Sequence, residues 1–550
     1  MGDLRIEVIL DKDNKTLTIR DRGIGMTATE VDKYINQIAF SGAEEFVKKM
    51  KKEDKAGIIG HFGLGFYSAF MVSDKVDIFT KTYKKGGETK PVHWECDGSP
   101  NYVIEETEKE ARGTDVVLHI MDEHKEFLDE HRIKSILDKY CKFLPVEIYF
   151  GTETIYEETG EKDKDGNPET KPVEKPRKIN NVEPAWTKAP ADLKEEDYDT
   201  FYRELYPMTF EQPLFHIHLN VDYPFNLTGI LYFPKVKQNI EVQRNKIQLY
   251  SNQVFVTDAV EGVVPDFLTL LHGVLDSPDI PLNVSRSYLQ SDGNVKKISK
   301  HITKKVADKL EELFKNNRED FEKKWDDVKV FIEYGMISDD NFYERAQKFM
   351  LLKNTDDKFF TIEEYKNHIE AQQTDKDKKL IYLYANNMDE QYSYIENAKA
   401  KGYDVLMMDS PLSSHFINKL EQKFENSSFV RVDADVVDKL IKKDEEIPSK
   451  LSEKEQAKLK EIIEKVVDNK QYTIVMENMN EEEMPISITR PEFMRRMKEM
   501  QMLGGGGMMM MGDMPEMMNM VINNNHPMIT QILEEKEEDK QKEMIHQLKD

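Results

Sequence analysis

The sequence predicts a multidomain α+β protein, and three observations support this prediction. The chain has 550 residues, of which 39% are hydrophobic, so it can bury several cores, and we expect three or four domains. Runs typical of strands, such as 4–10 and 16–20, alternate with runs that have the period of a helix. Two glycine clusters, at residues 21–26 and 60–66, lie in the first part of the chain.

The charge balance and the cysteine content exclude several classes of protein. Acidic residues outnumber basic ones by 104 to 78, which gives a net charge of −26. A general nucleic-acid-binding protein would need basic contacts to phosphates, so we expect no nucleic-acid partner. Cys96 and Cys141 lack metal-ligand spacing, and we expect no metal site built from cysteine or histidine. The chain has neither a signal peptide nor an apolar run long enough for a bilayer, so we expect a cytoplasmic protein without membrane contact.

The first glycine cluster, Asp21-Arg-Gly-Ile-Gly-Met26, follows directly on the strand predicted at 16–20. Its carboxylate, held on a tight glycine turn, is suited to accept a hydrogen bond from an adenine amine. Thr27 and Glu30 have the spacing of a capping box, which predicts that a helix begins immediately after the cluster.

The second glycine cluster, Gly60-His-Phe-Gly-Leu-Gly-Phe66, offers backbone N–H groups that lead into an apolar run at 66–72, predicted to be a buried helix. Such N–H groups and the helix dipole stabilise phosphate oxygens. The polar stretch 41–59 is either a lid over a ligand or a plain surface excursion. Each cluster alone is equally well explained as a structural turn. Together, in this order, they indicate an adenine-nucleotide pocket, and the absence of a following Lys-Ser/Thr excludes a P-loop.

The remaining elements follow from hydrophobic periodicity. Strands are predicted at 75–83, 91–95, 101–105, 113–118, 214–221, 229–233, 247–249, 253–256, 379–384 and 403–408. Helices are predicted at 194–205, 295–334, 389–401, 413–422, 452–468 and from 527 to the end. Residues 157–181 are charged and rich in turn formers, which predicts a solvated linker. The Gly/Met-rich segment from Met502 to Met520 is either an adaptable surface for unfolded clients or a flexible loop.

Several motifs resemble those of the Hsp90 family of chaperones along essentially the whole chain. They are Asp21–Met26, Ile38–Gly42, Gly60–Ser68, Gly113-Thr114, Gly229–Pro234, Val254–Val256, Pro281–Arg286 and Asn525–Pro527. The resemblance is to the bacterial branch, because no long acidic linker is present. It implies a GHKL-type α/β sandwich nucleotide domain, an α/β middle domain and a mixed, mainly helical C-terminal dimerisation domain. The implied boundaries are 1–156, a charged linker at 157–181, 182–450 and 451–550.

The resemblance also implies site residues. Those placed around ATP are Asp21, Gly23, Gly25, Met26, Ser41, Gly42, Gly60, Phe62, Gly63, Gly65, Phe66 and Thr114. Arg286, supported by Asn283 and Gln290 of the same loop, would reach the γ-phosphate, since an always-charged, planar guanidinium suits that contact. The cofactors implied are ATP and Mg²⁺, and the partners are non-native client proteins and a second copy of the chain.

The sequence departs from the family pattern in three places. No residue before Asp21 can be assigned as the glutamate that positions the attacking water, or as the asparagine that binds Mg²⁺, so we expect the nucleotide domain to lack its first strand and helices. Phe40 stands where many relatives have a lysine. The final dimerisation helices are expected to be missing, which leaves dimerisation through this end in doubt.

Two hypotheses from different classes follow. In the first, the protein is an ATP-driven chaperone clamp with ATPase activity. In the second, this chain is a nucleotide-independent holdase or an inactive fragment, because the segment with the general base is absent. A sensor histidine kinase, topoisomerase or mismatch-repair ATPase is less favoured, because the sequence has neither a phosphoacceptor-histidine helix nor a basic DNA-binding surface.

Overall fold

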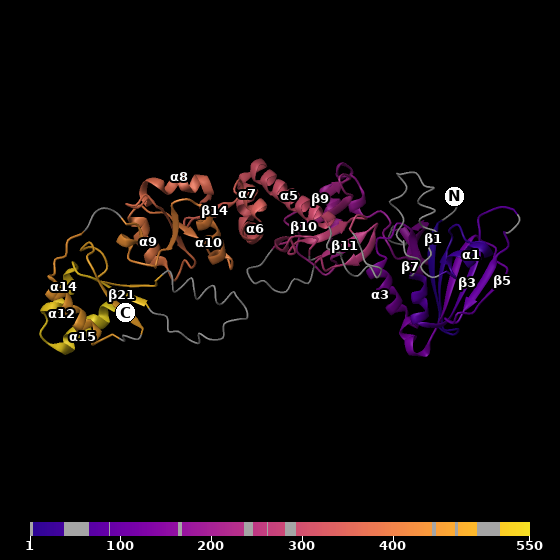
Figure 1. Ribbon diagram of the computed structural model, residues 1–550, viewed down its shortest axis with the longest axis horizontal. Coiled ribbons are helices and arrows are strands. Elements are labelled where there is room, and N and C mark those ends of the chain that lie inside the picture. Colours follow the sequence, from indigo (N-terminus) through magenta and orange to yellow (C-terminus); the bar gives the residue numbers. More distant parts are fainter. Residues whose placement is uncertain are drawn as a thin grey trace. The chain divides into compact units, whose positions relative to one another are not determined.

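The computed structural model of the chain (Figure 1) describes residues 4–37, 65–86, 89–162, 168–235, 246–260, 262–280, 293–442, 447–467, 471–491 and 518–549. The described residues divide into two compact units, which meet between residues 305 and 306. This single division does not coincide with the predicted boundaries at 156, 181 and 450, which stay predictions.

An eight-stranded sheet forms the first half of the first unit, in the order β5-β4-β3-β6-β2-β1-β7-β8. Its strands are β1 (Arg5–Asp11), β2 (Thr16–Asp21), β3 (Ser73–Lys81), β4 (Val92–Cys96), β5 (Tyr102–Glu106), β6 (Gly113–Ile120), β7 (Glu147–Lys162) and β8 (Pro168–Lys178). Neighbouring strands are antiparallel except β1 and β7, which are parallel. The strands predicted in this region are therefore confirmed to within about two residues.

One face of this sheet is apolar and covered by helices. The register places Val8, Ile19, Val116, Ile78 and Trp94 in one row across five strands. Helices α1 (Ala28–Tyr34) and α3 (Glu130–Tyr140) and the 3₁₀ segment η2 (Gly65–Met71) pack against this face, whereas the opposite face is lined with charged and histidine side chains. A sheet with helices on one face confirms the predicted α/β sandwich.

Two expectations in this region are wrong. Most of 157–181 is not an irregular linker, because it forms much of the hairpin β7–β8, in which Ile155 lies opposite Val173. Strand β8 is the edge of the sheet, so these strands need few apolar residues. The run 66–72 is not a buried helix, because η2 buries no residue completely. Only Phe66, Ala69 and Phe70 of this segment contact the core, and Met71 is 72% exposed.

A five-stranded sheet, in the order β12-β11-β13-β10-β9, completes the first unit. Its strands are β9 (Phe215–Val221), β10 (Leu227–Phe233), β11 (Ile247–Ser251), β12 (Val254–Thr257) and β13 (His272–Asp276). Helix α4 (Glu195–Leu205) packs on this sheet through an aromatic core that includes Trp186, Tyr202 and Tyr232. Short 3₁₀ segments lie at η3 (Asp122–Leu128), η4 (Ala185–Thr187), η5 (Pro190–Asp192) and η6 (Asp266–Leu268).

The first half of the second unit has the predicted βαβ organisation. Its parallel sheet has the order β17-β16-β18. The elements are β14 (Leu351–Lys353), β15 (Phe359–Thr361), β16 (Leu380–Ala385), β17 (Val405–Met407), β18 (Ser427–Arg431), α6 (Arg318–Ser338), α7 (Asp340–Ala346), α8 (Ile362–Gln373), α9 (Tyr392–Ala400), α10 (Ser413–Lys423) and α11 (Val437–Leu440). The helix predicted at 295–334 is two helices, α5 (Gly293–Asn316) and α6, because Asn317 caps the second one.

The last described part of the chain contains a three-stranded sheet, β19-β21-β20, and three helices. They are β19 (Tyr472–Glu477), β20 (Ile486–Thr489), β21 (Met518–Asn523), α12 (Glu453–Glu464), α14 (Pro527–Glu534) and α15 (Glu538–Lys549). Met518 and Met520, expected in a surface or a loop, lie in the central strand, and Met520 is fully buried. Met502–Met517 lies outside the described residues. None of the helices in the described ranges is long and apolar enough to cross a bilayer.

Candidate nucleotide site

Asp21 lies at the C-terminal end of β2, and the glycine turn that follows is folded around its carboxylate. The Gly23 N–H donates to Asp21 Oδ1 at 2.7 Å, and the Thr114 N–H also donates to this carboxylate. Burial raises the pKa of Asp21, while these two backbone hydrogen bonds act in the opposite direction. A carboxylate has about four lone-pair positions, so Asp21 can still accept hydrogen bonds from a ligand.

Gly25 brings the turn into direct contact with the end of β3. Its φ of +60° lies in the left-handed region, and a Cβ there would be 1.9 Å from the Lys81 carbonyl oxygen. The Tyr83 N–H donates to the Ile24 carbonyl at 2.8 Å, which holds the two segments together. Only glycine fits this approach, whereas the prediction that Gly25 lets the backbone approach an adenine base stays a prediction.

Gly113 makes a second such contact on the other side of Asp21. Its φ is +110°, and a Cβ there would be 2.2 Å from the Asp21 carbonyl oxygen. The residue after it, Thr114, is 8% exposed and lies at the start of β6. Thr114 is therefore placed beside Asp21 by the pairing of β2 with β6.

Thr80, which no sequence motif indicates, lies next to Thr114 in the candidate site. It is fully buried on β3, directly opposite Thr114 on β6, and the two hydroxyl oxygens are 3.0 Å apart. Its Oγ1 also accepts a hydrogen bond from the Met26 N–H at 2.9 Å. No local pattern marks Thr80, because its role depends on the register between β3 and β6.

Helix α1 begins immediately after the turn, as predicted. Thr27 and Glu30 form the expected capping box, in which the Glu30 N–H donates to Thr27 Oγ1 at 3.2 Å and the Thr27 N–H donates to Glu30 Oε2 at 2.9 Å. Lys84 forms an ion pair with Glu30 at 2.5 Å. The cap fixes where α1 starts, and therefore also where the turn from Asp21 to Met26 ends.

The phosphate side of the predicted site is described only in part. Phe66 belongs to the hydrophobic core, where its ring lies 5.7 Å from that of Trp94, and Gly65 begins η2. Ser41, Gly42, Gly60, Phe62 and Gly63 lie outside the described residues, as do Asn283, Arg286 and Gln290. Their predicted contacts with phosphates therefore stay predictions.

The residues that are described fit the adenine end of a nucleotide. They combine a half-buried carboxylate with unused acceptor positions, a buried hydroxyl beside it and a glycine turn held against the end of β3. Such a combination can bind a flat ring that carries an amine.

One group of potential metal ligands lies elsewhere, on the open face of the eight-stranded sheet. Ligand atoms of Asp77, His93 and Glu95 lie within 4.8 Å of one another. Lys75 Nζ, however, is 2.7 Å from Glu95 and 3.4 Å from Asp77. This ammonium group already pairs with both carboxylates and would repel a metal cation, so we infer no metal site here.

Comparisons with known proteins match both parts of the chain. Residues 3–120 match the family described as histidine kinase-, DNA gyrase B- and HSP90-like ATPase, and residues 151–550 match the family described as Hsp90 protein. The chaperone protein HtpG of Bacteroides fragilis strain YCH46 is 58% identical over 505 residues, which cover 91% of this chain and 72% of that protein. The protein of the same name from Porphyromonas gingivalis strain W83 is 56% identical over 505 residues, with the same coverage. The one from Bacillus subtilis strain 168 is 33% identical over 474 residues, which cover 84% of this chain and 73% of that protein.

Proposed function

The chain belongs to the Hsp90 family, and on that basis we propose that it is an ATP-dependent chaperone that remodels partly folded client proteins through an ATP-driven clamp cycle. These matches support directly that it is a molecular chaperone with a nucleotide domain of the family's ATPase type. The clamp cycle, homodimerisation and a cytoplasmic location are parts of the proposal.

The arrangement of Asp21 and Thr114 is the observation that carries the nucleotide part of the proposal. The carboxylate of Asp21 would accept from an amine of the ligand, and the hydroxyl of Thr114 lies beside it on the same covered face of the sheet. An adenine ring presents an amine next to a ring nitrogen, so both groups find a partner on one edge of the base. Gly25 lets the turn lie directly against the end of β3, where a Cβ would be 1.9 Å from the Lys81 carbonyl oxygen.

The other residues of the proposed site act on the phosphates. The N–H groups of the cluster Gly60–Phe66 would bind phosphate oxygens, and Arg286 would contact the γ-phosphate once the parts of the protein close around ATP. Bound Mg²⁺ would neutralise phosphate charge. The comparisons do not favour the alternative of a nucleotide-independent holdase.

Calorimetric titration of the purified chain with ADP tests the proposal. We expect saturable binding that the Asp21→Asn substitution weakens at least about 100-fold, because an amide replaces an acceptor-only carboxylate and the charge-assisted hydrogen bond is lost. Asp138→Asn, on the partly exposed side of α3, is the matched control and should bind like the original chain. Absence of ADP binding by the original chain would contradict the nucleotide part of the proposal and would favour the holdase.

A further inference from the structure

We propose that Thr80 is a positioning residue that orients the hydroxyl hydrogen of Thr114 toward the base and thereby makes the site prefer adenine to guanine. This inference rests on the proposed nucleotide function. It concerns a residue with no expected contact to the ligand, which acts through Thr114.

The hydrogen-bond partners of Thr80 restrict how its hydroxyl group can be used. A backbone N–H can only donate, so the bond from Met26 N, 2.9 Å long, uses the oxygen of Thr80 as an acceptor. Thr80 is fully buried and has one hydroxyl hydrogen left to donate. The acceptors within reach among the described residues are Thr114 Oγ1 at 3.0 Å and the Gly113 carbonyl oxygen at 3.4 Å.

The two distances favour Thr114 as the acceptor. Hydroxyl-to-oxygen hydrogen bonds are usually about 2.7–2.8 Å long, and a separation of 3.4 Å lies beyond their normal range. If Thr80 donates to Thr114, then the hydrogen of Thr114 points away from Thr80. Thr114 then directs its one hydrogen toward the pocket, and a ligand group that donated to Thr114 instead would leave this hydrogen without a partner.

With Thr80 donating to Thr114, the site presents one acceptor and one donor to the ligand. The acceptor is the Asp21 carboxylate, which already receives the Gly23 N–H at 2.7 Å. The donor is the Thr114 hydroxyl. Adenine offers an amine and an acceptor nitrogen, which match this pattern directly or through one water. Guanine offers a carbonyl oxygen and a ring N–H on the corresponding edge, and this reversed pattern would place an acceptor against the carboxylate.

A closed ring of hydrogen bonds around the turn would keep the hydrogen bond from Thr80 to Thr114 in this direction. It runs from Asp21 through the Thr114 N–H, from Thr114 Oγ1 to Thr80 Oγ1, and from Thr80 Oγ1 to the Met26 N–H. The chain segment from Asp21 to Met26 closes the ring. Each member is therefore held by two others, and loss of the Thr80 hydroxyl would free both Thr114 and the end of the turn.

The test compares binding of ADP and GDP to the full chain by calorimetry. The original chain and Thr80→Ser, which keeps the hydroxyl, should share the same preference for ADP. Thr80→Val has nearly the same shape without the hydroxyl, and it should lose about 10-fold in ADP affinity while GDP affinity changes less than about 3-fold. A merely structural role would lower both affinities by the same factor, so an unchanged ratio overturns the inference.

Two further measurements keep the test decisive. In a Thr114→Val background, Thr80→Val should cause no further change in the ADP/GDP ratio, whereas an independent effect of Thr80 on the ratio contradicts action through Thr114. If Thr80→Val does not fold, Thr80→Cys provides a weak donor of similar size and should give an intermediate ratio, and a ratio equal to that of the original chain overturns the inference. If the original chain fails to bind ADP, the proposed function fails as well, whereas binding with an unchanged ratio overturns this inference alone.

Discussion

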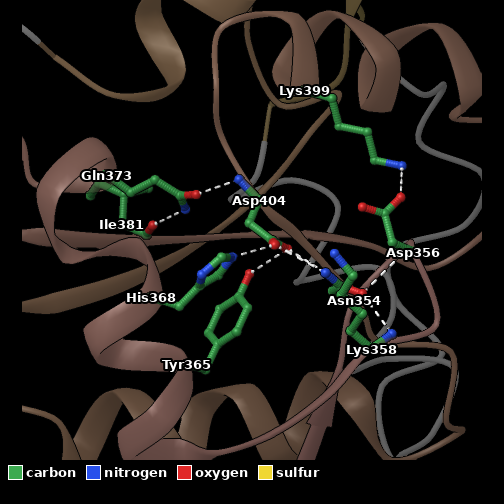
Figure 2. A network of polar contacts seen from close by, with 9 residues as sticks. All are labelled: Asn354, Asp356, Lys358, Tyr365, His368, Gln373, Ile381, Lys399 and Asp404. Carbon is green, nitrogen blue, oxygen red and sulfur yellow. Dashed lines mark hydrogen bonds and ion pairs between the residues drawn. The ribbon is translucent and has the colours of Figure 1, made fainter.

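The carboxylates of Asp21 in the first unit and Asp404 in the second differ in what surrounds them. Both oxygens of Asp404 are occupied by side-chain donors, as Figure 2 shows: Asn354 Nδ2 at 3.0 and 3.1 Å, His368 Nε2 at 2.8 Å and Tyr365 OH at 3.3 Å. Asp21 has two backbone donors from the turn and the strand that flank it. The number and type of donors therefore separate a carboxylate that can bind a ligand from one that connects structural elements.

The surroundings of Asp404 show its structural role. Its backbone N–H donates to Gln373 Oε1 at 2.6 Å, and Gln373 Nε2 donates to the Ile381 carbonyl at 2.8 Å (Figure 2). Asn354 Oδ1 also accepts from the N–H groups of Asp356 and Lys358. This network joins the β14–β15 turn, the end of α8 and the strands β16 and β17, and it uses the acceptor capacity that a ligand would need.

Alanine substitutions at Asp404 and Asp21 should have opposite effects on stability and on ADP binding. Asp404→Ala should lower the free energy of unfolding by about 3 kcal/mol, because Asn354 and Tyr365 are buried and would lose their acceptor. It should leave ADP affinity unchanged. Asp21→Ala should do the opposite, with ADP binding lost and a much smaller change in stability. Thermal unfolding and calorimetric titration of both variants measure the two effects, and a loss of ADP binding in Asp404→Ala would show that the comparison is wrong.

A third carboxyl group differs from both Asp21 and Asp404, because it is buried without enough hydrogen-bond donors. Glu333 on α6 is only 5% exposed, and its Oε2 has no hydrogen-bond partner among the described residues. Burial raises the pKa of Glu333 from 4.5 to about 7. A raised carboxyl pKa gives stability that is complete below the unfolded-state value and is lost as the pH rises through the folded-state value.

We therefore expect the stability of the original chain, relative to Glu333→Gln, to fall as the pH rises from 4.5 to above 7. The total change should be up to about 3 kcal/mol, since one pKa unit corresponds to about 1.4 kcal/mol. Unfolding measured at several pH values tests this, with the exposed Glu363→Gln as control for the loss of one charge. A difference that does not vary with pH would contradict the pKa shift.

Gly25→Ala tests whether stability and ADP binding depend on the close contact between the backbones of Gly25 and Lys81. The substitution should lower the free energy of unfolding by about 2 kcal/mol, because alanine is strained in the left-handed region and its Cβ would lie 1.9 Å from the Lys81 carbonyl oxygen. Gly262→Ala is a matched control, because Gly262 has a φ of +83° with nothing within 4 Å of the added Cβ, so that it shows the strain alone. Chemical denaturation and ADP titration of both variants separate the backbone strain from the collision with Lys81. If Gly25→Ala lowers stability no more than Gly262→Ala does, the close contact with Lys81 is not needed.

The predictions made from sequence succeeded where the deciding interactions are local. The capping box of Thr27 and Glu30 is such a case, since both partners lie within one turn of helix. The helix break at Asn317 was missed because the apolar period continues through it, and the strands in 157–181 were missed because a sheet edge tolerates charge. Met520 was assigned to a low-complexity segment because composition does not show that a strand passes through the middle of a sheet.

The sequence alone was enough to predict the family, the order of most strands and helices, and Asp21, Gly25 and Thr114 as candidate site residues, because these depend on short motifs and on local periodicity. The three-dimensional arrangement was needed to show that the Thr80 hydroxyl contacts Thr114 and Met26, and that Phe66 contributes its ring to the core. It also decided that the Asp404 carboxylate is already occupied. The physical reason is that strand register and burial bring together residues far apart in the chain, and hydrogen-bond capacity can be assigned only when all these neighbours are known.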